Sequence, residues 1–167
     1  MAAVSDVPAG ARAQVVTVSD RSFQGVRPDT SGPLLATLLS DLGFTVGPVV
    51  VVPDEVPAIQ AALRAAVSAG SDVVVTTGGT GFSPRDVTPE ATAPLLERQA
   101  PGLVEALRQH RREQVPTTIL SRAVAGTIGR SLVLNLPGST GGVRDGVEVL
   151  APVLGHLVGQ LRGSDHT

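Results

Sequence analysis

The chain has 167 residues and a formal net charge of −2, so its length fits a single domain and its charge lacks the basic footprint of nucleic-acid-binding proteins. Hydrophobic residues make up 42% of the chain and charged residues 17%, which excludes general disorder. All 13 basic residues are arginines and there is no cysteine, which excludes lysine-dependent phosphate chemistry, thiolate metal sites and cysteine nucleophiles.

The first half of the chain alternates between strand and helix patterns. Residues 14–18 form a short β-branched run that predicts a strand. Pro33 then opens a stretch of leucines at helical spacing, which Gly43 ends. Residues 44–52 predict a second strand, and an apolar stripe over residues 56–67 predicts a second helix.

The second half continues the alternation. Residues 72–76 are apolar throughout their middle, which is typical of a parallel strand covered on both faces. Residues 131–136 predict another buried strand, and residues 143–161 predict a long helix. Pro152 lies inside that helix, where a proline is expected to kink or split it.

This alternation predicts one α/β domain over residues 14–162, folded as a three-layer sandwich around a mostly parallel central sheet. Residues 1–13 and 163–167 are small and polar, and we expect them to be flexible termini. In such sheets ligands bind at the carboxyl ends of the strands. That rule selects four loops, those after Val18, Val52, Thr77 and Leu136.

No segment carries a membrane signal. No apolar run approaches the about 20 residues that span a bilayer. The first residues also lack the basic region and apolar core of a signal peptide. We therefore expect a cytoplasmic protein without a membrane or nucleic-acid partner.

The loop after the third predicted strand is rich in glycine. Gly78, Gly79 and Gly81 allow backbone N–H groups to approach a bound oxyanion, and Thr80 adds a hydroxyl donor. The spacing matches neither the dinucleotide-binding fingerprint nor the P-loop. The loop is therefore either a phosphate-type site or a tight turn without a ligand.

Asp54 and Asp86 follow the second and third predicted strands. If those strands are neighbours, both carboxylates lie at the same edge of the sheet. Two carboxylates beside a phosphate site suit Mg²⁺. As alternatives, Asp54 caps the helix that begins near Val56, and Asp86 pairs with Arg85 or shapes a turn.

The first and last loops offer further polar groups. Asp20 suits the cap of a turn, and Asp29-Thr30-Ser31 offers caps for the helix that Pro33 opens, with Ser31 favoured. Pro137-Gly138 marks a turn, and Gly141-Gly142 before a long helix suggests backbone amides aimed at an anion. From the residues alone we expect an α/β protein with a phosphate-type site and Mg²⁺, and the turn and cap alternatives stay open.

Taken together and in this order, the loop motifs are more specific than any one of them. They are Val18-Ser19-Asp20-Arg21, Asp29-Thr30-Ser31-Gly32-Pro33, Val52-Pro53-Asp54-Glu55, Thr77 to Gly81 with Arg85 to Thr92, Leu120-Ser121-Arg122 and Asn135-Leu136-Pro137-Gly138. The combination closely resembles the Mog/MoaB family of molybdenum-cofactor biosynthesis proteins, over roughly residues 14–162.

The resemblance implies a molybdopterin adenylyltransferase, which transfers AMP from ATP to molybdopterin with Mg²⁺ and releases pyrophosphate. It also implies a homotrimer and a handover of product to the protein that inserts molybdate. Matching positions make Asp54 and Asp86 the catalytic, Mg²⁺-holding carboxylates. The residues expected to bind the nucleotide and the pterin are Ser19, Asp20, Gly78, Gly79, Thr80, Gly81, Ser121, Asn135, Pro137, Gly138 and Ser139.

One departure keeps an alternative open. Adenylylating members often continue Pro-Gly with Asn-Pro or Gln-Pro, whereas this chain has Pro137-Gly138-Ser139-Thr140, as in the MoaB branch. The alternative is a non-catalytic molybdopterin-binding scaffold, and a third reading is an unrelated nucleotide-binding module. In a lysine-free chain, Arg21 or Arg85 are the cations expected to face phosphate, together with the metal.

Overall fold

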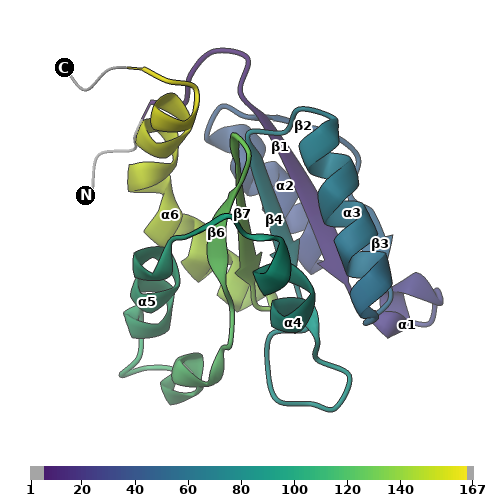
Figure 1. Cartoon of the computed structure of the whole chain (residues 1–167). Coiled ribbons are helices and arrows are strands. Elements are labelled where there is room, and N and C mark those ends of the chain that lie inside the picture. Colours follow the sequence, from purple (N-terminus) through teal and green to yellow (C-terminus); the bar gives the residue numbers. More distant parts are fainter. Residues whose placement is uncertain (1–5, 165–167) are drawn as a thin grey trace.

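The structure, a computed structural model, describes residues 6–164. Its centre is a seven-stranded sheet in the order β2-β1-β4-β7-β6-β5, in which β3 also pairs with β1 (Figure 1). The strands are β1 (Arg12–Val18), β2 (Thr45–Val46), β3 (Val50–Val52), β4 (Val73–Thr77), β5 (Arg98–Gln99), β6 (Ala125–Ile128) and β7 (Ser131–Leu136). All neighbouring pairs are parallel except those that β6 makes with β5 and β7.

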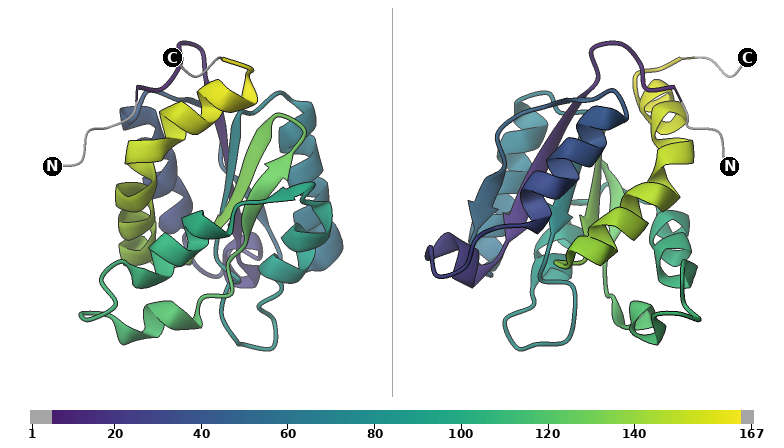
Figure 2. Two further views of the ribbon diagram at one scale, coloured as in Figure 1. Left: turned by 60° about the vertical axis from the view of Figure 1, so that its left-hand side comes forward. Right: turned by 180° about the vertical axis from the view of Figure 1, so that it is seen from behind.

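Helices cover both faces of the sheet, which confirms the three-layer α/β fold. One face carries α2, α5 and α6, and the other carries α3 and α4 (Figure 2). The α-helices are α1 (Asp20–Phe23), α2 (Ser31–Asp41), α3 (Val56–Ser68), α4 (Thr88–Thr92), α5 (Pro101–Gln109) and α6 (Thr140–Leu161), with 3₁₀ turns η1 (Ala93–Leu95) and η2 (Pro116–Leu120). No helix within residues 6–164 has the length and apolarity that crossing a membrane requires.

The central strands are buried on both faces because their successive side chains enter different cores. In β4, Val73 and Val75 belong to the core under α2 and α6, whereas Val74 belongs to the core under α3. β7 alternates in the same way, with Leu134 on the first side and Val133 on the second. A continuous apolar run is therefore what a period of two produces in a strand covered twice.

One strand prediction was wrong in its bounds, and one condition set for the site is not met. The predicted strand over residues 44–52 is divided into β2 and β3 around Gly47 and Pro48, because a proline has no N–H to donate to the ladder. The second and third predicted strands are not neighbours, since β1 lies between β3 and β4. These strands are all parallel, so their carboxyl ends still share one edge.

The ends of two helices also differ from expectation. Ser31 is not the cap of α2, because it lies inside the helix and the N-cap is Thr30, whose side chain makes no capping bond. The N–H of Gly32 is instead satisfied by Asp29, whose Oδ1 accepts it at 3.0 Å. Pro152 does not split the last helix, since α6 is one element. Proline removes only one N–H donor from a helix of 22 residues, and its neighbours are packed against the sheet.

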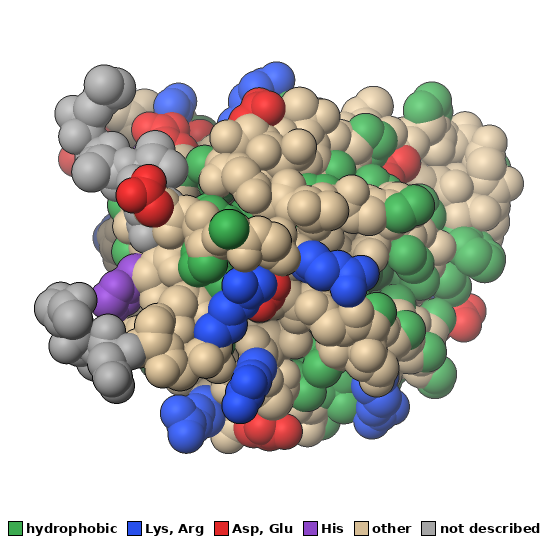
Figure 3. Space-filling model, turned by 90° about the horizontal axis from the view of Figure 1, so that it is seen from above, with side chains coloured by type: hydrophobic (Ala, Val, Ile, Leu, Met, Phe, Trp, Pro, Cys, Tyr) green, Lys and Arg blue, Asp and Glu red, His purple; other side chains and the backbone are tan. Residues whose placement is uncertain are grey.

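The folded region begins before residue 14. β1 starts at Arg12, and Ala11 and Ala13 belong to the core next to α2 and α6. Of the two predicted flexible termini, residues 1–5 and 165–167 lie outside the described part of the chain. Figure 3 shows the edge of the sheet at which β1 begins, where basic and acidic side chains lie beside one another instead of forming a surface of one sign.

At that edge Asp72 joins the two ends of the domain. Its carboxylate accepts hydrogen bonds from Arg162 after α6, both at 2.9 Å, and from the backbone N–H of Arg12 at 2.8 Å. Burial by itself would raise the pKa of Asp72. The hydrogen bonds and charges of Arg162 and Arg12 outweigh it and hold the pKa below the ordinary value.

A lowered pKa means that Asp72 stabilises the fold fully above the ordinary aspartate pKa, and that this stabilisation is lost as the pH falls through the folded-state value. We expect Asp72→Asn to lower the free energy of unfolding at neutral pH by about 2 kcal/mol, as for hydrogen bonds to charged groups. Urea titrations at several pH values should show that difference shrinking in acid. Glu105→Gln, at an exposed position of α5, is the control; a difference independent of pH would contradict the assignment.

Candidate functional site

Two cavities open at the edge where β1, β3, β4 and β7 end. The first, of about 400 Å³, is lined mainly by polar groups and is called the polar cavity. The second, of about 450 Å³, has walls from Phe82, Leu107, Val115 and Leu120 and is called the apolar cavity. Ser139 lines both cavities, so they lie next to each other.

The predicted binding residues are divided between the cavities. Ser19, Gly78, Gly79, Gly138, Asp54 and Asp86 line the polar cavity. Thr80, Gly81, Ser121 and Pro137 line the apolar cavity. Asp20 and Asn135 line neither one.

The glycines of the loop after β4 are required by close contacts. Gly78 and Gly79 have φ angles of 104° and 69°, a region that favours glycine. A Cβ on Gly78 would collide with the carbonyl oxygen of Val18, and one on Gly79 with the hydroxyl of Thr88. The same hydroxyl donates to the carbonyl of Gly78 at 2.9 Å and so holds the turn. The loop is therefore a tight turn, as one of the two alternatives predicted. The turn also brings the backbone of Gly78 and Gly79 to the wall of the polar cavity.

Asp20 and Asp54 bind each other's backbone. The N–H of Asp20 donates to Asp54 Oδ2 at 2.8 Å, and the N–H of Asp54 donates to Asp20 Oδ1 at 2.9 Å. Asp54 is thus no cap for α3, whose N-cap is Glu55. Arg85 pairs with Asp20 at 2.9 Å, so it neutralises a carboxylate instead of being available for phosphate. The Arg85 hydrogen bond also lowers the pKa of Asp20.

Asp86 shapes its own loop and faces the polar cavity. Its Oδ2 accepts the N–H of Ser83 at 3.1 Å, as the turn alternative predicted, and Arg85 does not pair with it. In both Asp54 and Asp86 the Oδ1 atom accepts no hydrogen bond from the residues that the structure describes. Each carboxylate therefore keeps one free oxygen.

The electrostatics of this cavity favour a cation. Burial is the main cause that raises the pKa of Asp54, and the negative charges of Asp20 and Asp86 raise it further. Free carboxylate oxygens in an acidic setting are the ligands that a hard divalent cation such as Mg²⁺ prefers. The donor set thus fits the metal predicted for Asp54 and Asp86.

Arg27 is a residue that sequence reasoning missed. Among the residues described as lining the polar cavity, it is the only basic one. The signal was weak, because Arg27 lies in the loop before Asp29 and not in a motif of its own. With Arg85 engaged elsewhere, Arg27 is the side-chain cation placed to meet a phosphate.

The start of α6 provides a further positive end. Ser139 caps the helix by accepting the N–H of Gly142 at 3.0 Å, and Gly141 and Gly142 line the apolar cavity. A helix N-terminus presents unpaired N–H groups and a partial positive charge. This positive end lies where the two cavities meet.

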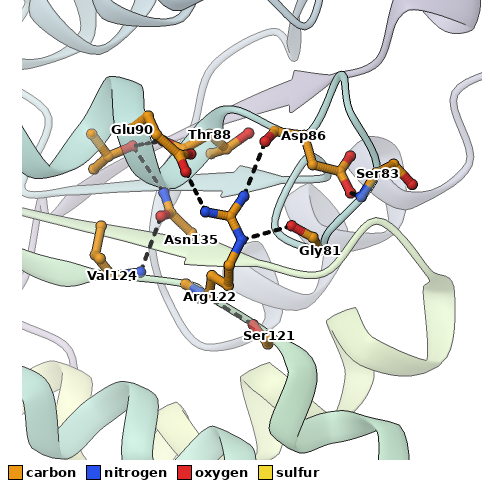
Figure 4. Close-up of polar contacts among 11 residues, drawn as sticks. Gly81, Ser83, Asp86, Thr88, Glu90, Ser121, Arg122, Val124 and Asn135 are labelled. Carbon is orange, nitrogen blue, oxygen red and sulfur yellow. Dashed lines mark hydrogen bonds and ion pairs between the residues drawn. The ribbon is translucent and has the colours of Figure 1, made fainter.

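Asn135 is buried and supports the site from behind. Its exposed fraction is 0%, and its Nδ2 donates to the hydroxyls of Thr76 and Thr92 at 2.9 and 3.1 Å. Its Oδ1 accepts the N–H of Val124 at 3.1 Å (Figure 4). Asn135 therefore ties β4, β7, α4 and the segment before β6 together and does not reach either cavity.

Arg122 is a second residue whose role the sequence did not reveal. It donates from Nε to the carbonyl of Gly81 at 2.8 Å and from Nη2 to the carbonyl of Asp86 at 3.0 Å, and it pairs with Glu90 (Figure 4). It also lies 5.3 Å from the centre of the Phe82 ring. Its motif, Leu120-Ser121-Arg122, was noticed, but only Ser121 was assigned. Arg122 fixes the loop that carries Asp86.

Comparisons with known proteins identify the family of the chain. The family described as "probable molybdopterin binding domain" matches residues 14–156. The chain is 44% identical over 158 residues to the "molybdenum cofactor biosynthesis bifunctional protein" of Synechococcus elongatus, covering 95% of this chain and 50% of that protein. It thus spans about half the length of the bifunctional relatives that it matches.

Two further relatives have nearly the same length. The "molybdopterin adenylyltransferase" of Pyrococcus furiosus is 40% identical over 153 residues, with 89% of each chain covered. The crystal structure of the molybdopterin biosynthesis enzyme MoaB from Thermus thermophilus has a TM-score of 0.86 and 45% identity, covering 92% of this chain and 97% of the other. Sequence and fold thus point to the same group of proteins.

Arg122 should limit the mobility of the loop that contains Asp86. Because three of its contacts hold residues 81–90, Arg122→Met should free that loop while β4 and β7 stay packed. Hydrogen exchange of the amides in residues 81–87 should accelerate by about tenfold or more. Arg112→Met, at an exposed position, is the matched control. Exchange that accelerates equally throughout the sheet would instead indicate general unfolding.

The pKa of Asp54 is raised, so its ionisation should affect stability in the opposite direction to that of Asp72. A pKa raised by burial and by neighbouring carboxylates means that the folded state becomes less stable as the pH rises through that pKa, and the loss persists at neutral pH. Asp54→Asn keeps an acceptor for the N–H of Asp20, so its melting temperature at neutral pH should equal or exceed that of the wild type. The difference should vanish in acid. A clearly lower melting temperature at neutral pH would refute this account.

Proposed function

Since the chain belongs to the family of the molybdopterin-binding domain, we propose that it is a molybdopterin adenylyltransferase of molybdenum cofactor biosynthesis. It transfers AMP from ATP to the terminal phosphate of molybdopterin and releases pyrophosphate. Family membership supports the pterin substrate, and the name of the Pyrococcus relative, molybdopterin adenylyltransferase, supports the adenylyl transfer.

The observation that carries the proposal is the pair of cavities that meet at Ser139. Both substrates combine a flat heterocycle with phosphate. The apolar cavity suits a ring, and the polar cavity, with its glycine loop and Arg27, suits phosphates. The positive end of α6 lies between them, where a phosphate joined to a ring would be placed.

The reaction brings two anions together. An oxygen of the pterin phosphate forms a bond to the α-phosphorus of ATP, and the bond from that phosphorus to the bridging oxygen of pyrophosphate breaks. Positioning and charge neutralisation are therefore the main tasks of the protein. Arg27, the amides around Gly78 and Gly79 and the start of α6 would hold the phosphates.

Asp54 and Asp86 would hold Mg²⁺ through their free Oδ1 atoms. When bound, the metal supplies positive charge that shields the phosphates. Because the chain has no lysine to neutralise the phosphates, we expect turnover to depend strictly on the metal. Asp20 positions Asp54 through their mutual backbone contacts, and Arg122 positions Asp86 through its loop.

The homotrimer and the transfer of product to a molybdate-insertion protein, both implied by the resemblance, remain part of the proposal. The first is open to measurement by sedimentation of the purified chain.

The test supplies molybdopterin, ATP and Mg²⁺ and measures adenylated pterin and pyrophosphate. We expect product from the wild type, none after EDTA, and recovery when Mg²⁺ is added back. Asp86→Asn should lower turnover by about a hundredfold or more, the usual scale for a lost group that stabilises transition-state charge. Its melting temperature should change little, and Glu105→Gln should behave as the wild type.

Other outcomes would select the rival functions. Tight pterin binding without product would favour the non-catalytic scaffold that Pro137-Gly138-Ser139-Thr140 suggested. Nucleotide binding without pterin binding would indicate a nucleotide-binding module outside cofactor synthesis. Near-normal turnover by Asp86→Asn would remove that carboxylate from the chemistry.

A further inference from the structure

Two buried polar atoms in the described part of the chain lack a hydrogen-bond partner, and both belong to residues of the apolar cavity. They are Nη1 of Arg108, at the end of α5, and Nε2 of His110. Buried polar atoms are nearly always paired in folded proteins, so an exception calls for an explanation. A ligand acceptor in the cavity is the explanation that their shared location suggests.

The two atoms differ in what surrounds them. His110 Nε2 lies 3.5 Å from Glu148 Oε2 and 4.0 Å from Asp145 Oδ1, so carboxylates face it. Arg108 forms no ion pair with any residue in 6–164. No carboxylate therefore neutralises the charge of Arg108. Unlike His110 Nε2, its Nη1 has neither a hydrogen-bond acceptor nor a carboxylate nearby among the described residues.

Arg108 is nevertheless held in one orientation. Its Nε donates to the carbonyl of Ser121 at 2.9 Å, and its Nη2 donates to the carbonyl of Ala123 at 3.3 Å. The hydroxyl of Thr118 donates to the carbonyl of Arg108 at 2.9 Å, which ties the end of α5 to η2. These contacts use Nε and Nη2 and leave Nη1 buried and without a partner, on a residue that lines the apolar cavity.

The remainder of the cavity indicates which acceptor Nη1 would meet. The walls from Phe82, Leu107 and Leu120 suit the faces of a flat ring, whereas the neighbouring polar cavity suits phosphate. The acceptor is then an atom on the edge of a ring. A guanidinium distinguishes an oxo group, which accepts hydrogen bonds, from an amino group, which only donates them.

We propose that Arg108 is a specificity-determining residue that donates from Nη1 to the ring carbonyl of an oxo-substituted heterocycle in the apolar cavity. This inference rests on the proposed function and deepens it. A pterin carries such an oxo group, and adenine carries an amino group instead. At that ring position Arg108 thereby favours a pterin over adenine in the apolar cavity.

The test compares two ligands that differ at one ring position. 6-Hydroxymethylpterin carries the oxo group, and 2,4-diamino-6-hydroxymethylpteridine carries an amino group in its place. Their intrinsic fluorescence allows titration with the full chain at neutral pH. We expect the wild type to bind the oxo compound about ten- to a hundredfold more tightly, as for a hydrogen bond from a charged donor. Arg108→Met should bind the two compounds with similar affinity.

Controls separate recognition from folding. Arg112→Met removes a nearby exposed arginine and should keep the full preference. AMP binding should be the same in the wild type and in Arg108→Met. The proposal is overturned if the wild type shows no preference, if Arg108→Met keeps it, or if Arg108→Met loses AMP binding instead. The ligand comparison in the wild type stays informative even if Arg108→Met fails to fold.

The outcome is independent of the adenylation assay. A preference for the oxo ring that depends on Arg108, in a protein that forms no adenylated pterin, would support this inference and refute the catalytic function. Adenylation by Arg108→Met with an unchanged KM for molybdopterin would support the catalytic function and refute the role of Arg108.

Discussion

The loop after β4 lies so close to its neighbours that no side chain fits at its turn. A Cβ on Gly78 would meet the carbonyl of Val18, and one on Gly138 would lie 3.2 Å from the Cα of Gly78. The loops that follow β1, β4 and β7 are thereby held together. The backbone of this loop forms part of the wall of the polar cavity, which Asp54 and Asp86 also line.

Five arginines of this lysine-free chain have one of two kinds of role. Arg85, Arg122 and Arg162 are used in structure, because each pairs with a carboxylate and ties two segments together. Arg27 and Arg108 instead line the polar and the apolar cavity, and neither forms an ion pair with a described residue. Asp54 has a different position. Burial and nearby carboxylates raise its pKa, so its charged form destabilises the fold at neutral pH. A bound cation would relieve that destabilisation.

Local patterns predicted the main elements because each of them is amphipathic or doubly covered. The β-branched runs of β1, β4 and β7 and the leucine spacing of α2 were sufficient to recognise strands and helices. β5 and β6 were not predicted, since they are short and their pairing depends on a distant contact. A Cβ on Gly126 of β6 would collide with the carbonyl of Arg98 in β5, which the sequence around Gly126 does not reveal.

The sequence by itself determined the three-layer fold, the edge of the sheet at which the site lies and the presence of Asp54 and Asp86 there, because period, β-branching and strand order along the chain are local properties. Only the tertiary structure decided which strands are adjacent and which side chains are partners. It placed β1 between β3 and β4, buried Asn135 behind the site, engaged Arg85 with Asp20, and brought Arg27 and Arg108 to the two cavities. The physical reason is that a charge or an amide takes its role from its partners, and those partners lie tens of residues away along the chain.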